Sequence, residues 1–158
     1  MIVWNSDIPI LPTDFTCSDL THLALTAPTN IRTILGLITI QPSLERLILH
    51  NITLDDIPPD ITIPERGAHE AMVPLNASID CLQINFVLEQ LVPELVILVT
   101  KYLLLRLPAL LQVHATQIPY HGMGNFVGEY AQWYPHLRNI GLTLTGGEDW
   151  PLINEAEE

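Results

Sequence analysis

The pattern of this chain is set by one phrase, Gln41-Pro42-Ser43-Leu44-Glu45-Arg46-Leu47-Ile48-Leu49. It contains a proline, a leucine two residues later, and then alternating apolar residues. The phrase Pro-x-Leu-x-x-apolar-x-apolar returns within residues 107–115 and 134–142, and a version without proline lies at 20–25. Recurrence of one phrase along a chain indicates a repeat architecture, in which function lies on an extended surface rather than in a pocket.

Each copy of the phrase joins an expected helix to an expected strand. Asn30 is a good N-cap, and the apolar residues after it share one helical face at spacings i, i+3, i+4 and i+7: Ile31, Ile34, Leu35 and Ile38. Pro42 ends this helix because the residue before a proline is disfavoured in the α region. Leu47 and Leu49 then alternate with other residues, which predicts a strand.

The same order is expected twice more. A helix that begins at Pro93 ends at Pro108, and a shorter helix ends at Pro135. The short helix is marked by Phe126, Val127, Tyr130 and Trp133 or Tyr134. The strands that follow the two helices are marked by Leu110, Val113 and Ala115, and by Leu137, Ile140, Leu142 and Leu144.

Two choices complete this assignment. Leu95 also follows a proline in the same phrase, but it lies only 15 residues before Leu110, too close for both to begin repeats. We therefore place Leu95 in a helix and expect a weaker strand over residues 79–85. The repeats then begin at positions 20, 44, 79, 110 and 137, and this irregular spacing indicates a degenerate repeat.

Leu44-x-x-Leu47-x-Leu49-His50-Asn51 resembles the leucine-rich-repeat signature, with its Asn one place early. More narrowly, residues 20–25, 42–47, 49–52 and 57–61 resemble the repeat region of F-box proteins that are abundant in mushroom-forming fungi. The resemblance extends over roughly residues 18–145. It implies an α/β leucine-rich-repeat solenoid fragment, with about five short parallel strands and helices on the convex side.

The resemblance also implies a function, the substrate-recognition part of an F-box ubiquitin-ligase receptor. Leu11-Pro12 resembles the start of an F-box only in part, because the repeats begin too soon after it to leave room for that helical module. We therefore expect a ubiquitin-ligase adaptor as a partner only where an F-box is supplied elsewhere. The expected organisation is an N-terminal extension (1–17), degenerate repeats (18–145) with a proline-rich loop (55–70), and an acidic tail (146–158).

Composition restricts the partners and the compartment. Six basic residues against 18 acidic ones argue against nucleic acid and against an anionic membrane surface. Residues 91–111 have the length of a membrane span but contain three charged residues, each costing about 2.5–3.5 kcal/mol at the bilayer centre. Cys17 and Cys81 are too few for a disulfide framework, and no signal peptide is evident, so we expect an intracellular protein, cytoplasmic or nuclear.

Motifs for chemistry are weak. Residues 51–53 and 76–78 match the glycosylation pattern, which we treat as coincidence in an intracellular protein. The glycine-containing segment 121–125 lacks a phosphate-loop lysine and is expected to be a turn. No Gly-x-Ser-x-Gly and no His-x-x-x-His occur, and the acidic residues of the proline-rich loop are expected to be solvated. We expect no enzyme activity, no cofactor and no metal.

What remains is the concave face of the sheet, where three columns of side chains are expected to face outward. The first column is His22, Arg46, Cys81, Gln112 and Asn139. The second is Ala24, Ile48, Gln83, His114 and Gly141. The third is Thr26, His50, Asn85, Thr116 and Thr143. Mostly neutral hydrogen-bonding groups suit a protein or peptide partner, although an ordinary solvated sheet face has the same composition.

Two further expectations concern the ends and the alternative. The terminal strands of a solenoid without polar caps expose their edges, which predicts self-association. The alternative to an interaction module is a small compact α/β enzyme that uses His114, His121 or Asp56. An enzyme predicts that such residues converge in a pocket, whereas a solenoid predicts parallel strands stacked in chain order.

Overall fold

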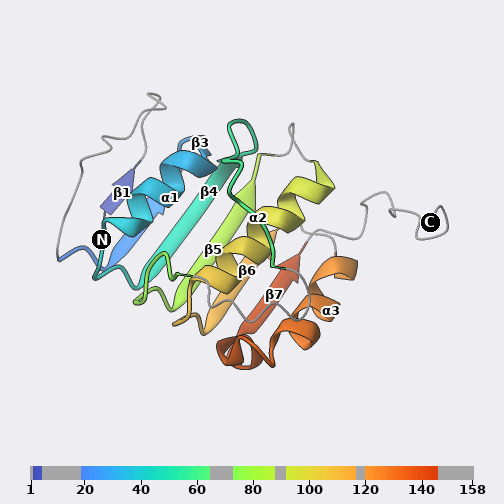
Figure 1. Ribbon diagram of the computed structural model, residues 1–158. Helices are drawn as coiled ribbons and strands as arrows, with labels where there is room; N and C mark the ends of the chain where they lie inside the picture. The colour runs from blue at the N-terminus through green and yellow to red at the C-terminus, as the bar shows by residue number, and fades with distance from the viewer. Residues whose placement is uncertain (1, 5–18, 65–72, 88–91, 117–119, 146–158) are drawn as a thin grey trace.

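A computed structural model describes residues 2–4, 19–64, 73–87, 92–116 and 120–145. Its centre is one seven-stranded sheet, in which six strands lie side by side in chain order and every neighbouring pair is parallel (Figure 1). These strands are β1 (Ile2–Trp4), β2 (His22–Leu25), β4 (Arg46–Thr53), β5 (Cys81–Phe86), β6 (Gln112–Thr116) and β7 (Gly141–Thr145). The short β3 (Thr29–Asn30) pairs with the end of β4. The strand order expected from the repeated phrase is confirmed.

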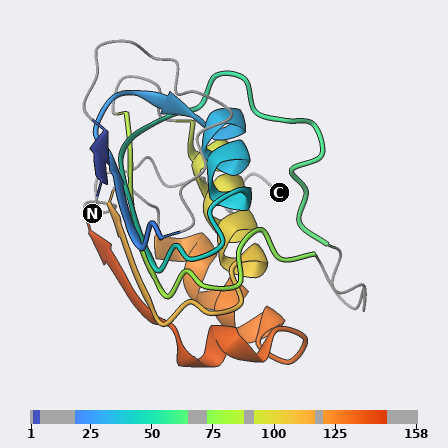
Figure 2. The ribbon, with the colours of Figure 1, turned by 90° about the vertical axis from the view of Figure 1, so that its left-hand side faces the viewer.

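The helices form a second layer on one face of the sheet. They are α1 (Ile31–Thr39), α2 (Pro93–Arg106), α3 (Tyr120–Tyr130) and the 3-10 helix η2 (Pro135–Asn139). In the turned view, α1, α2 and α3 all lie on the same side of the strands (Figure 2). The assignment of Leu95 to a helix is confirmed, because it lies in the first turn of α2.

The repeated proline phrase forms the same turn in all three copies. Proline occupies the second position of the turn, for which its fixed φ is suited, and the leucine N–H closes the turn on the residue before the proline. The three hydrogen bonds join Leu44 to Gln41 at 3.2 Å, Leu110 to Leu107 at 3.2 Å, and Leu137 to Tyr134 at 3.0 Å. The unit that begins at Ile79 also lacks this proline and uses a side chain instead: the Ser78 N–H donates to Oδ1 of Asn76 at 2.8 Å.

A second backbone pattern recurs where the strands begin. At three successive steps, one carbonyl of a unit accepts the N–H groups of two successive residues in the next unit, which sets neighbouring strands in register. Thr21 accepts from Glu45 and Arg46, Glu45 accepts from Asp80 and Cys81, and Asp80 accepts from Leu111 and Gln112, at 2.8–3.2 Å. The repetition seen in the sequence therefore corresponds to repetition of backbone geometry.

The core lies between the sheet and the helices. Its strand residues are at most 1% exposed and alternate with residues of the other face: Leu47, Leu49, Leu82, Ile84, Val113 and Ala115. The leading residue of every unit is also buried, at Leu20, Leu44, Ile79, Leu110 and Leu137. On α1 the buried stripe is Ile31, Ile34, Leu37 and Ile38, while the expected Leu35 is only partly buried.

Three sequence expectations are wrong in detail. The sheet has seven strands rather than about five, because the short strands β1 and β3 carry no alternation long enough to detect. Residues 121–125 belong to α3 rather than to a turn. The last strand begins at Gly141, because residues 135–139 form η2 instead of entering the strand.

The proline-rich segment 57–64 has no helix or strand, as expected. Residues 65–70 of the expected loop, the rest of the N-terminal extension beyond β1 and the acidic tail lie outside the described residues. Helix α2 is 14 residues, or about 21 Å, long. Within the described part of the chain, no helix is long and apolar enough to cross a membrane.

Candidate functional site

The candidate site is the face of the sheet opposite the helices. Parallel sheets are normally covered on both faces, so an uncovered face needs side chains that tolerate water. No helix of the described residues lies over this face (Figure 2). In β6 the pattern is regular: Gln112 and His114 are exposed here, whereas Val113 and Ala115 are buried towards the helices. We call this surface the open face.

Strand register places the expected side chains in rows across the open face. The first row is His22, Arg46, Cys81, Gln112 and Gly141. The second row is Ala24, Ile48, Gln83, His114 and Thr143. Both rows agree with the expected columns except in the last strand, where η2 delays the start of β7 by two residues. Gly141 therefore replaces Asn139, and Thr143 replaces Gly141.

The third row is less regular because β4 contains a bulge between Leu49 and Ile52. Asn85 and Thr116 are neighbours, and the Thr116 hydroxyl donates to Oδ1 of Asn85 at 2.7 Å. Thr145, rather than the expected Thr143, continues this row. The other two expected members, Thr26 and His50, lie beside the bulge, where the side chain of Asn51 donates to the Thr26 carbonyl.

Exposure is uneven across the open face. The exposed members are Arg46, Gln112, His114, Gly141 and Thr143. Partly exposed members are His22, Thr26, Ile48, His50, Cys81, Gln83, Asn85 and Thr116. Ala24 is only 6% exposed, so the expectation that it contributes accessible surface is wrong. The accessible part of the face is therefore concentrated on β4 to β7.

The polar groups of the open face are mostly uncharged at neutral pH. Arg46 is the only residue of the three rows with a fixed charge, and the accessible remainder consists of amides, hydroxyls, imidazoles, a thiol and one aliphatic side chain. Cys81 is a free thiol and is partly exposed. His22 is held by a neighbour, with its Nδ1 2.9 Å from the Thr21 hydroxyl. Such a surface can exchange hydrogen bonds with a partner without burying many charges.

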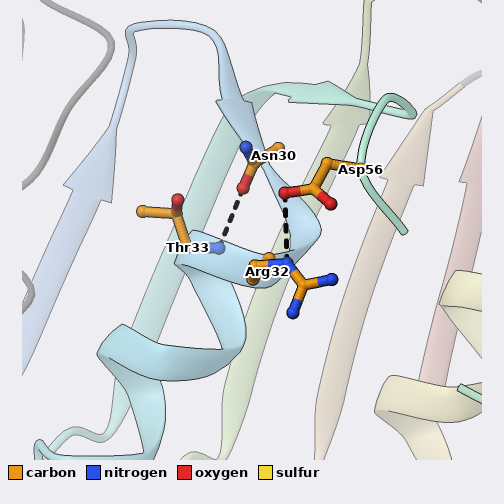
Figure 3. Close-up of polar contacts among 4 residues, drawn as sticks. All are labelled: Asn30, Arg32, Thr33 and Asp56. Atoms are coloured by element: carbon orange, nitrogen blue, oxygen red, sulfur yellow. Dashed lines mark hydrogen bonds and ion pairs between the residues drawn. The ribbon is translucent and has the colours of Figure 1, made fainter. Parts of the chain in front are cut away.

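Two of the three residues expected for the alternative enzyme, Asp56 and His114, have described side chains, and these do not lie at a common site. Asp56 lies in a turn of the helical layer and pairs with Arg32 at 3.1 Å, next to the Asn30 cap of α1 (Figure 3). His114 lies on the opposite, open face. The backbone of His121 lies in α3, and its side chain is outside the described part. The described residues hold no group of three or more His, Cys, Asp or Glu that could bind a metal ion.

A cluster of aromatic and cationic side chains in the helical layer is not evident as a unit from the sequence. The rings of Phe126 and Tyr130 are 4.7 Å apart, and those of Tyr130 and Trp133 are 5.8 Å apart. Lys101 lies 5.1 Å from the centre of the Phe126 ring. The sequence signal that could have found this cluster is the helical spacing of its aromatic residues, which by itself indicates only a helix.

The aromatic cluster also anchors the proline-rich loop. The Tyr130 hydroxyl donates to the Pro64 carbonyl at 2.6 Å, and burial raises the pKa of this phenol. Arg106 stacks 4.9 Å from the Tyr102 ring and donates to the Val73 carbonyl at 2.9 Å. We interpret the cluster as structural, because its polar groups are directed at the chain itself.

The two glycosylation patterns do not present free amide groups. Asn76 is 7% exposed, and its amide nitrogen donates to the carbonyls of Ile38 and Gln41 at 2.9 and 2.7 Å. The amide of Asn51 donates to Thr26. In the folded chain both side chains are therefore engaged in holding neighbouring units together.

Comparison with known proteins identifies no relative. No protein-family model matches the chain, and neither the curated proteins nor the solved structures contain a match. The placement of residues is accordingly the basis for any assignment of function.

Proposed function

We propose that this chain is a non-enzymatic interaction module of the leucine-rich-repeat type, which binds a protein or peptide on its open face. By its resemblance, the module serves as the substrate-recognition part of an F-box ubiquitin-ligase receptor inside the cell. The parallel strands in chain order and the one-sided helical layer support the repeat assignment. Recurrence of the proline turn in three units supports it further.

The proposal is based on one face of the parallel sheet that none of the described helices covers. Because such sheets are normally covered on both sides, a face with in-register polar rows is suited to being covered by something else. Its hydrogen-bonding groups are spaced by the strand separation, about 4.8 Å. An extended segment that crosses the strands can therefore meet one side chain after another along a row.

The chemistry of the open face restricts the partner. Gln83, Gln112 and His114 offer both donors and acceptors, and they suit polar side chains or the backbone of an extended segment. Arg46 provides one site for a carboxylate. We therefore expect a partner segment that is predominantly polar and neutral and carries an acidic residue towards the β4 side.

The test is quantitative capture of partners from cells with matched variants of the full chain. The open-face variant is Gln112→Glu with His114→Glu, which adds like charges to two exposed positions without touching the core. The control is Gln132→Glu with Asn139→Glu, which makes the same change in charge at exposed positions in the helical layer. Circular dichroism and urea unfolding establish that both variants fold.

Partners that are retained by the control and lost by the open-face variant support binding at this face. Equal recovery by the two variants overturns it. Ubiquitin-ligase subunits among the recovered proteins support the receptor role, whereas recovery of other proteins alone supports an interaction module with a different role. Turnover of a substrate abolished by Asp56→Asn or His114→Gln would instead favour the enzyme.

A further inference from the structure

The chain contains five arginines but a single lysine, Lys101. The two side chains differ in their reactivity towards acyl groups. A lysine amine can lose its proton and attack an acyl group, whereas an arginine guanidinium remains protonated and does not. Among the side chains, Lys101 is thus the one amine that could accept an acyl group.

The structure places this amine inside the contact between two helices. Lys101 is partly buried in the middle of α2, and its Nζ lies 5.1 Å from the centre of the Phe126 ring on α3. Phe126 is only 2% exposed, so the ring is itself fixed in the core. Glu129, one turn further along α3, adds an attractive charge. The ammonium group therefore lies against α3 in a cation–π contact, and the negative charge of Glu129 favours its protonated form.

Lys101 also lies on the side of the sheet opposite the proposed binding surface. The helices cover one face, and the rows that contain Gln112 and His114 occupy the other (Figure 2). A partner on the open face and the amine of Lys101 are therefore separated by the whole sheet and core. Exposed arginines near these surfaces, such as Arg46 and Arg138, cannot replace Lys101 as acceptors.

We propose that Lys101 is an occluded amine and that the chain thereby escapes acylation of its own side chains while a bound partner remains open to modification. The biological part of this inference rests on the proposed ubiquitin-ligase role. In the reaction avoided, the neutral amine attacks the thioester carbonyl of a carried ubiquitin. A C–N bond forms, the C–S bond breaks, and the carrier leaves as a thiolate, which takes up the proton that the amine loses.

Desolvation has two opposing consequences for this amine. It lowers the pKa of Lys101, although Glu129 acts in the opposite direction, and a lower pKa increases the neutral, reactive fraction. The same burial blocks the approach of a bulky acyl carrier. An experiment must therefore compare Lys101 with an accessible lysine in the same molecule and at the same pH.

Arg138→Lys supplies that comparison, because residue 138 is exposed in η2 and the substitution conserves charge. The folded variant is treated with an N-hydroxysuccinimide ester of acetate, and labelling of each lysine is followed by peptide mass spectrometry. We expect Lys101 to react about tenfold more slowly than position 138 in the folded chain, and at the same rate in urea. Equal rates in the folded chain would overturn the occlusion.

A second arm uses ubiquitin itself as the acyl group. The wild-type chain and Arg138→Lys are incubated with ubiquitin, ATP, the activating enzyme and a conjugating enzyme that transfers ubiquitin to free lysines. We expect conjugates at position 138 of the variant and none at Lys101 of either protein. Conjugation at Lys101, or its absence at both positions, overturns the escape from modification by occlusion. The open-face capture experiment is independent of this result and tests the proposed function separately.

Discussion

The side-chain amide of Asn76 donates to the main-chain carbonyl of Gln41 at 2.7 Å, across 35 residues of sequence. The same nitrogen donates to the Ile38 carbonyl at 2.9 Å, while Oδ1 accepts from the Ser78 N–H at 2.8 Å. One buried side chain thus stabilises the end of α1, the first proline turn and the turn that leads into β5. In this unit it takes the place of the proline turn that three other units use.

Asn76→Ala should lower the free energy of unfolding by about 2–4 kcal/mol, because it removes three hydrogen bonds at a buried position. The Gln41 carbonyl keeps its bond from the Leu44 N–H, whereas the Ser78 N–H loses the Asn76 oxygen. Urea unfolding measures the effect as a lower midpoint with an unchanged m-value. Asn139→Ala, at an exposed position, is the control and should change stability by less than about 0.5 kcal/mol. Equal effects of the two substitutions would contradict the assigned role.

Two substitutions of Asp56 should separate the effect of its backbone conformation on stability from the effect of its ion pair. Asp56 has φ 56°, in the left-handed region, and pairs with Arg32 where both side chains are more than half exposed (Figure 3). Asp56→Gly and Asp56→Ala both remove the ion pair, which contributes about 0–1 kcal/mol. Only alanine retains the strain of a β-carbon, so we expect Asp56→Ala to be about 1 kcal/mol less stable than Asp56→Gly in urea unfolding. The opposite order would contradict the left-handed conformation.

Apolar side chains of the core should contribute less to the stability of the fold towards β7. Leu82 in the central strand β5 is 0% exposed, whereas Leu142 at the corresponding position of the edge strand is only partly buried. Leu82→Ala should cost about 2–5 kcal/mol and Leu142→Ala about 1 kcal/mol, because a smaller area is lost from the core at the edge. Thermal and urea unfolding of both variants check this difference. A larger cost at Leu142 would indicate that β7 is covered by further chain or by a partner.

Stability should fall in alkali because burial raises the pKa values of Tyr102, Tyr130 and Tyr134 above the usual 10.0. Near pH 10 and above, the unfolded chain releases these protons before the folded chain does, so deprotonation favours unfolding. The loss begins near pH 10 and ends above the raised pKa values of the folded state. Lys101, with its lowered pKa, acts in the opposite direction below pH 10.5.

Tyr102→Phe isolates one part of this dependence, because it removes a titrating group that lies in the core at 3% exposure. Denaturant unfolding at pH 8, 9, 10 and 11 should give a shallower loss of stability for the variant than for the wild-type chain. Superimposable pH profiles would show that the Tyr102 phenol titrates alike in the folded and unfolded states.

Much of the architecture could be predicted because its signals are local. Proline at positions 42, 108 and 135 fixes φ and ends a helix or begins a turn wherever it occurs. Alternation in residues 46–49 and 112–115 requires one face of a strand to be buried, and Asn30 caps a helix through a contact only three residues away. These features, with the repeated order, predicted the strand order and the members of the first two rows on β2, β4, β5 and β6, but not on β7.

The remainder depends on contacts between distant residues. A 3-10 helix at 135–139 shifts β7 by two residues, and packing of Phe126 and Tyr130 against the core supports a helix through a glycine-containing segment. The pairing of β1 with β2 and the burial of Ala24 likewise depend on contacts that form only in the folded chain. Local patterns were sufficient to locate the three proline turns and strands β2, β4, β5 and β6, because backbone preferences act over a few residues. Which face of the sheet the described helices leave open, and which side chains lie on it, follows from the folded structure alone, because burial depends on the whole chain.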